Sequence, residues 1–292
     1  MRALALPSSK SLRDAVPFVV LFVAAFAALA WPTFLWMAER FDTHDSFYSH
    51  GWLVPFASGW LVWQRRETLQ SISHRGTFKG LRLLLPALAV YLLATWWRIG
   101  FLAGFALLGV VYGLVWTCWG SAVFWALRFP LFFLIFMVPL PGVLLITISF
   151  KMKLMAATLA TKFLGLIGIP AMQAGSTIRL RNVSVIVDDT CSGLRSLISL
   201  IALGTLWMAL MPPTSTRGQK LLVVASSIPI ALIANMVRIL FMVLMSAIYG
   251  AQIADSFIHY GSGIVLFGVA VCALAGFSRI VQEWPGSLAT NR

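Results

Sequence analysis

The stretch from Lys220 to Met242, KLLVVASSIPIALIANMVRILFM, carries a charged side chain only at Lys220 and at Arg238. An α-helix needs about 20 predominantly apolar residues to cross a hydrocarbon core of roughly 30 Å. This stretch is therefore predicted to span a membrane. Seven other apolar runs resemble it, so we expect about eight transmembrane helices, at residues 16–37, 48–63, 82–98, 101–118, 121–140, 192–211, 220–242 and 261–280.

The composition of the chain agrees with this interpretation. Of its 292 residues, 60% are hydrophobic and 11% are charged, and the mean hydropathy is +0.90. A soluble domain has far more charge and less apolar content. The apolar runs are continuous, whereas a β-barrel shows short alternating segments. We predict an all-α polytopic membrane protein that forms a single integral-membrane domain over residues 1–292.

The net charge of +13 comes from short basic clusters between the apolar runs, not from one long basic stripe. Such clusters are typical of topology signals and argue against nucleic-acid binding. The strongest cluster, in residues 64–81, is expected to lie in the cytoplasm. Basic residues before the first span and after the last one predict that both termini are cytoplasmic too. The first run, 16–37, is long for a signal peptide, so we expect it to remain as a span.

An extracytoplasmic insert is predicted at about residues 141–190. Residues 143–169 hold three lysines among apolar residues, which favours an amphipathic helix at the membrane interface, with a further span or a re-entrant pair as the alternative. Residues 170–189 alternate apolar and polar side chains, which predicts a small β element of two strands. This element leads directly into Cys191.

Three reactive side chains meet at the outer face in this topology: Cys191 at the start of one span, Arg238 at the end of the next, and His259 before the last. Cys118 and Cys272 fall elsewhere in the topology and are expected to be small buried residues. A thiol at a helix N-terminus faces backbone amides that favour the thiolate. Cys191 is therefore a candidate nucleophile, with a structural thiol as the open alternative.

Neighbouring residues add further candidates. Asp188 and Asp189 disfavour a second anion beside them, yet either one can also cap the helix. Asn235 lies three residues before Arg238 on the same helical face, and such a polar stripe inside a span often marks a working site. Arg195 lies one turn after Cys191 and is a candidate for the same pocket or for binding lipid phosphates.

The sequence offers three histidines on the outer face, His44, His50 and His259, and their spacing does not rank them as the acid or base. A metal site formed by His44, Asp45 and His50 lacks the tight ligand spacing of known sites. We therefore expect no metal and no other cofactor. No Cys-x-x-Cys pair is present, which argues against a thiol-disulfide enzyme.

Five ordered blocks of the chain resemble the exosortase family, the bacterial relatives of archaeosortases. They are Tyr48-Ser49-His50-Gly51-Trp52-Leu53-Val54-Pro55, Phe129-Pro130-Leu131 through Pro139-Leu140-Pro141, Cys191-Ser192-Gly193-Leu194-Arg195-Ser196, Asn235-Met236-Val237-Arg238 and His259-Tyr260-Gly261-Ser262-Gly263. The resemblance implies a bacterial inner-membrane cysteine protease or transpeptidase with its site on the periplasmic side. It assigns the catalytic positions to Cys191, Arg238 and His259.

The resemblance also implies the partners of the chain. They would be exported proteins that end in a Pro-Glu-Pro-like motif, a hydrophobic helix and a basic tail, besides the membrane lipids. The alternative function is that of a non-enzymatic transporter or assembly component for exopolysaccharide export, in which Asn235 and Arg238 line a substrate path.

Overall fold

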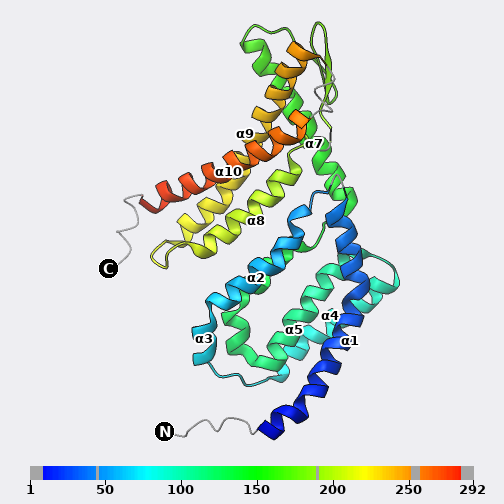
Figure 1. Ribbon diagram of the computed structural model, residues 1–292, viewed down its shortest axis with the longest axis vertical. Coiled ribbons are helices and arrows are strands. Elements are labelled where there is room, and N and C mark those ends of the chain that lie inside the picture. Colours follow the sequence, from blue (N-terminus) through cyan, green and yellow to red (C-terminus); the bar gives the residue numbers. More distant parts are fainter. Residues whose placement is uncertain (1–8, 44–45, 189–190, 251–256, 284–292) are drawn as a thin grey trace. The chain divides into compact units, whose positions relative to one another are not determined.

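A computed structural model describes residues 9–43, 46–188, 191–250 and 257–283, without the side chains of residues 9–16, 19 and 257–260. The described chain is mostly helical and has one small sheet (Figure 1). It forms two compact units: Met1–Arg40 with Glu67–Ala126, and Phe41–Arg66 with Leu127–Arg292. The chain therefore starts in the first unit, enters the second unit at residues 41–66, returns to the first unit at residues 67–126 and ends in the second unit.

The first unit is built on three helices, α1 (Ser9–Asp42), α4 (Leu81–Trp96) and α5 (Gly100–Ala126), with the short elements α3 (Arg66–Ser71) and η2 (Phe78–Gly80) between them. Its core holds Ala30 of α1, Tyr91 of α4 and Leu107 of α5. The Tyr91 hydroxyl donates a hydrogen bond of 2.6 Å to the carbonyl of Leu29. This bond gives the hydroxyl group of a fully buried ring a hydrogen-bond partner, and it links α4 to α1.

In the second unit, α8 (Leu194–Leu210) and α10 (Phe257–Glu283) both pack against α9 (Arg217–Tyr249) (Figure 1). Their shared core includes Leu200, Val223 and Leu274, one from each helix. Helix α9 begins with a capping box between Thr216 and Gln219. The three helices form the bundle from which the candidate site is built.

A second layer of the same unit contains η1 (Ser49–Trp52), α2 (Leu53–Gln64), α6 (Arg128–Phe133) and η3 (Leu134–Met137). The Ser58 hydroxyl donates to the carbonyl of Pro130 at 2.8 Å, and the amide of Leu140 donates to the Tyr48 hydroxyl at 3.3 Å. Residues 128–140 therefore run back along α2 in the opposite direction. The expected continuous helix over 121–140 is wrong, because α5 ends at Ala126 and the following segment divides into two short helices.

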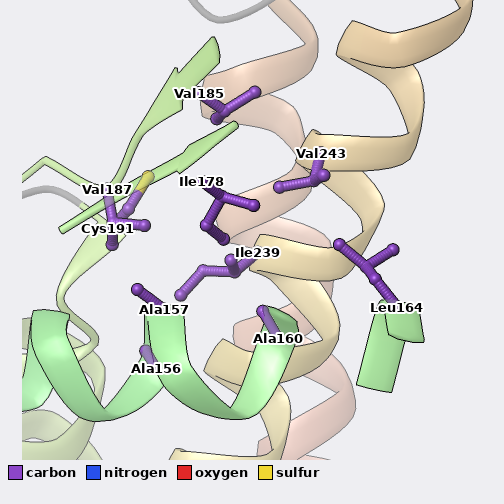
Figure 2. Packing of buried hydrophobic residues seen from close by; sticks show 10 residues of the cluster. All are labelled: Ala156, Ala157, Ala160, Leu164, Ile178, Val185, Val187, Cys191, Ile239 and Val243. Atoms are coloured by element: carbon purple, nitrogen blue, oxygen red, sulfur yellow. The ribbon is translucent and has the colours of Figure 1, made fainter. Parts of the chain in front are cut away.

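The insert begins with α7 (Gly142–Leu166) and continues into strands β1 (Met172–Ala174), β2 (Thr177–Arg179) and β3 (Ser184–Ile186). The strands form an antiparallel sheet in the order β1-β2-β3. The alternating pattern predicted two strands, and the structure has a third. Buried Ile178 and Val185 point from the sheet toward α7 and α9 (Figure 2).

Within the described residues, six helices are long and apolar enough to cross a membrane: Val20–Asp42, Phe78–Trp96, Gly100–Ala126, Gly142–Leu166, Arg217–Tyr249 and Gly261–Glu283. Five of them coincide with expected spans. The expected spans 48–63 and 192–211 correspond to α2 and α8, which are shorter than this length, whereas α7, expected at the membrane interface, reaches it. The chain is thus a helical multi-pass membrane protein, and the number of eight spans stays a prediction.

Candidate active site

The turn that carries Cys191 is held by α9. The Asn235 side chain is buried, and its Nδ2 donates a 3.0 Å hydrogen bond to the carbonyl of Cys191. Gly193 has the left-handed backbone conformation, with φ of 77°, and a Cβ added there would lie 2.6 Å from Cγ of Asn235. Only glycine leaves room for this close approach at low strain. The Asn235 side chain therefore fixes both ends of the Cys191–Gly193 turn.

Cys191 itself does not lie in a helix N-terminus, which corrects the sequence prediction. Helix α8 begins at Leu194, and the left-handed Gly193 separates it from Cys191. The Cys191 amide donates to the carbonyl of Asp188 at 3.0 Å. Because the chain turns at Gly193, the proposed thiolate stabilisation by first-turn amides of α8 loses its structural basis.

The Cys191 side chain forms part of an apolar cluster (Figure 2). Only 7% of the residue is exposed, and the cluster around it includes Ala157 of α7, Val187 and Ile239 of α9. Apolar surroundings favour a neutral thiol over a thiolate. A reaction at this sulfur would therefore need a base that takes the proton.

Arg238 connects α9 to α10. A Cβ added at Gly263 would lie 3.4 Å from both Cζ and Nη2 of Arg238, so the guanidinium lies against the α10 backbone. Asn235 and Arg238 are one helical turn apart on α9. This single face of α9 therefore contacts the Cys191 turn through Asn235 and helix α10 through Arg238.

The remaining predicted residues near this turn are only partly described. His259 falls in the first turn of α10, and its side chain lies outside the described residues. Asp189 also lies outside them, as do His44 and Asp45. Asp188 is exposed and contributes its backbone carbonyl to the turn. Within the described residues, no group of three candidate metal ligands occurs.

A cavity of about 700 Å³ opens beside the turn. Its walls come from η1, α2, α6, α8, α9 and α10, all in the second unit. Most of the lining is apolar, and its polar residues are Ser49, His50, Arg195, Ser196, Ser199 and Arg238. The structure thus brings Arg195 and His50, both candidates from the sequence, to one cavity with Arg238 and with Gly193 of the Cys191 turn.

His50 is held on two sides at this cavity. Its Nδ1 lies 3.1 Å from the Ser199 hydroxyl, and its ring stacks on Tyr48 with 5.7 Å between centroids. The Phe136 backbone carbonyl also interacts with the ring.

Sequence reasoning did not identify Ser199. The available signal was its position four residues after Arg195, on the same face of an apolar helix. The other two cysteines also differ from expectation, since Cys118 and Cys272 are exposed and Cys191 is buried. Cys118 and Cys272 lie on α5 and α10, candidate membrane spans whose outer surface can face lipid. A small apolar side chain carries no penalty there.

Residues 36–276, most of the chain, match the family model described as transmembrane exosortase. The matched range includes Cys191, Asn235, Arg238 and His259. No curated protein and no solved structure matches the chain.

Proposed function

Because this chain belongs to the transmembrane exosortase family, we propose that it is a membrane-embedded cysteine protease or transpeptidase that removes the C-terminal sorting signal of exported proteins. The observation that carries the proposal is the hydrogen bond from Asn235 to the Cys191 carbonyl. It joins the turn of the candidate nucleophile, Cys191, to the helical face that bears Arg238. A reacting thiol needs this kind of rigid support.

In the first step, the sulfur of Cys191 attacks the carbonyl carbon of the scissile peptide bond. Because the thiol is buried among apolar side chains, a base has to accept its proton as the S–C bond forms, and we assign this role to His259. The same imidazole then gives the proton to the leaving amine. The C–N bond breaks, and the C-terminal sorting signal departs as the amine. The rest of the exported protein stays bound to Cys191 as a thioester.

Arg238 is assigned to the oxyanion that forms in this step. Its guanidinium lies against Gly263, and His259 occupies a position one turn earlier on α10. Helical spacing of four residues puts these two α10 positions on the same face. A fixed cation beside the developing negative charge lowers the barrier without reorganising at the moment of reaction.

The second step consumes the thioester. Attack by water gives a protease, whereas attack by an amine or another nucleophile on a carrier gives a transpeptidase. In both cases, the acceptor loses a proton and Cys191 regains its thiol. The substrates proposed from the family resemblance are exported proteins with a Pro-Glu-Pro-like motif, an apolar helix and a basic tail.

The proposed location is the bacterial inner membrane. Both termini would lie in the cytoplasm, and Cys191, Arg238 and His259 would act on the periplasmic side. The basic clusters at residues 2–13, 64–81 and 217–220 support this orientation. Residues 1–292 would work as one integral-membrane domain, with the insert of about 141–190 on the outer side.

Substitution of the nucleophile tests the proposal. Cys191→Ala and Cys191→Ser should insert normally and stop processing of a co-expressed substrate, which a mobility shift on a gel reports. Cys118→Ser and Cys272→Ser are matched controls that should process normally, since both thiols are exposed and neither belongs to the Cys191 cluster or to the cavity lining. Normal processing by both Cys191 variants would reject the cysteine mechanism and leave transport as the better interpretation.

A further inference from the structure

The strand that leads to Cys191 lies at an edge of the small sheet. Strand β3 pairs with β2 on one side, and no strand of the described chain pairs with it on the other. Ile186 is 62% exposed, and Ser184 is exposed as well. An edge strand presents a row of main-chain donors and acceptors to which another chain can pair. Within the part of the chain that the structure describes, this side of β3 is therefore open to an added strand.

The register of the β2–β3 hairpin shows which main-chain groups face the open edge. The amide of Val187 donates to the carbonyl of Ser176 at 3.0 Å, in line with the pairing of β2 and β3. Along an antiparallel strand, the main-chain groups of successive residues point alternately toward and away from the partner strand. Those of Val185 and Val187 therefore face β2, whereas those of Ser184 and Ile186 face the open edge.

The open edge ends at the candidate nucleophile. Asp188 lies two positions after Ile186, and its carbonyl accepts a 3.0 Å hydrogen bond from the amide of Cys191. A hydrogen bond between residues i and i+3 closes a tight turn. This turn brings Cys191 back beside the end of β3. An extended chain that pairs along the open edge therefore runs toward the Cys191 turn.

The opposite edge of the sheet is anchored instead. The Thr158 hydroxyl of α7 donates to Oε1 of Gln173 in β1 at 2.9 Å, and Nε2 of Gln173 donates to the carbonyl of Leu154 at 3.4 Å. These bonds hold β1 against α7. The sheet is thus fixed at β1, and its other edge leads to Cys191. A fixed sheet loses little conformational entropy when a strand is added to it.

We propose that the open edge of β3 is the docking site of the substrate main chain: an extended segment next to the scissile bond joins the three-stranded sheet as a fourth strand and pairs with Ser184 and Ile186. In this mode of recognition, main-chain hydrogen bonds supply the affinity. The candidate nucleophile at the end of the edge favours a peptide that is to be cleaved over a second copy of the chain. The proposal rests on the proposed function, because a peptide substrate is its premise.

Methylation of the peptide backbone tests this pairing. The probe is a short fluorescent peptide with the Pro-Glu-Pro-like motif, titrated into the purified Cys191→Ala protein in detergent while anisotropy reports Kd. Only every second amide of an added strand faces its neighbour. An N-methyl group should therefore weaken binding roughly tenfold at alternate residues and have little effect at the residues between them. The two prolines fit this pattern, because their missing amide hydrogens fall on the same side of the strand.

A proline in β3 tests the same contact from the protein. Ile186→Pro removes an amide hydrogen that faces the open edge and leaves the bonds to β2 in place, so it should weaken binding roughly tenfold. Arg181→Pro is the matched control in the turn between β2 and β3, where proline is compatible with the chain and no positive φ is needed. Its Kd should stay unchanged, since the lost charge is exposed and screened by salt. Thermal unfolding checks that both variants fold.

The outcomes separate this proposal from its alternatives. Absence of peptide binding, or N-methylation effects that do not alternate, would overturn the docking site and leave the cysteine mechanism standing. Light scattering of the protein without peptide examines a second copy as the occupant. A dimer that Ile186→Pro converts into a monomer would assign the edge to self-association and reject the proposal. Processing of a substrate by Cys191→Ala would instead reject the proposed function.

Discussion

Asn235 contacts the Cys191 turn at two points, by a hydrogen bond to the Cys191 carbonyl and by van der Waals contact with Gly193. The spacing of Asn235 and Arg238 on one helical face was visible in the sequence. Their partners were not, because Cys191 and Asn235 are separated by 44 residues and helical periodicity has no such range. For the same reason, the contact between His50 and Ser199 could not be predicted, because the two residues are 149 positions apart.

Removing the Asn235 amide should loosen the turn. In Asn235→Ala the buried Cys191 carbonyl loses a donor and a void opens beside Gly193, which should cost about 1–3 kcal/mol and lower processing at least tenfold. Asn235→Asp keeps the shape but turns an acceptor toward the Cys191 carbonyl, so it should be worse than Asn235→Ala. Thermal unfolding in detergent and substrate processing measure the two effects.

Ser246→Ala is the control on the same helix. Its buried hydroxyl has no hydrogen-bond partner among the described residues, so its loss should leave both measurements near those of the unaltered protein. Activity and melting temperature of Asn235→Asp equal to those of the unaltered protein would contradict the assigned contact.

Among the elements, α8 shows how a single glycine moves a helix boundary. The apolar pattern predicted a span from residue 192, but the helix starts at Leu194 because Gly193 adopts a positive φ. Sequence cannot reveal this choice, since glycine accepts both signs of φ. The left-handed turn also separates the Cys191 thiol from the helix that was expected to activate it.

A side chain at Gly193 should damage this junction. In Gly193→Ala the left-handed conformation costs roughly 1–2 kcal/mol, and the new Cβ, 2.6 Å from Cγ of Asn235, adds a clash. We expect a lower melting temperature and loss of processing. Gly268→Ala is the matched control on α10, where a Cβ meets no atom within 4 Å, and it should be neutral or slightly stabilising.

The clash itself can be tested with a double variant. Gly193→Ala combined with Asn235→Ala should be less destabilised than the sum of the two single variants, because the shorter side chain makes room for the new methyl group. Additive effects would show that the two residues do not touch.

At the scale of the whole molecule, helical content and membrane insertion followed from composition alone, whereas the number of crossings did not. Hydropathy treats 121–140 as one run, but α5 ends at Ala126, and residues 128–140 run back along α2 with hydrogen bonds to Ser58 and Tyr48. For α7, hydropathy favours a membrane span, whereas packing favours a place against the extracytoplasmic sheet. Its length and composition make it a candidate span, yet its buried face, Ala156, Ala157, Ala160 and Leu164, packs with the sheet and with Ile239 and Val243 of α9.

The length of α9 favours the membrane surface for α7. From Arg217 to Arg238, α9 rises about 32 Å, enough to cross the hydrocarbon core. Ile239 and Val243 follow this stretch, so the part of α9 that packs with α7 lies beyond the segment that crosses the hydrocarbon core. We therefore predict that α7 lies at the outer interface and does not cross the membrane.

Single cysteines at the two ends of α7 decide between these positions. In a background without native cysteines, Gly142→Cys and Gly165→Cys lie roughly 35 Å apart along the helix, and both should react with an impermeant reagent added from the periplasm. His74→Cys, in the basic loop expected in the cytoplasm, should not react. Labelling of the two α7 positions from opposite sides would make α7 a true span. One additional crossing would also move Cys191 to the cytoplasmic face, where it could not reach substrates that have been exported. This measurement therefore tests the topology and the proposed function together.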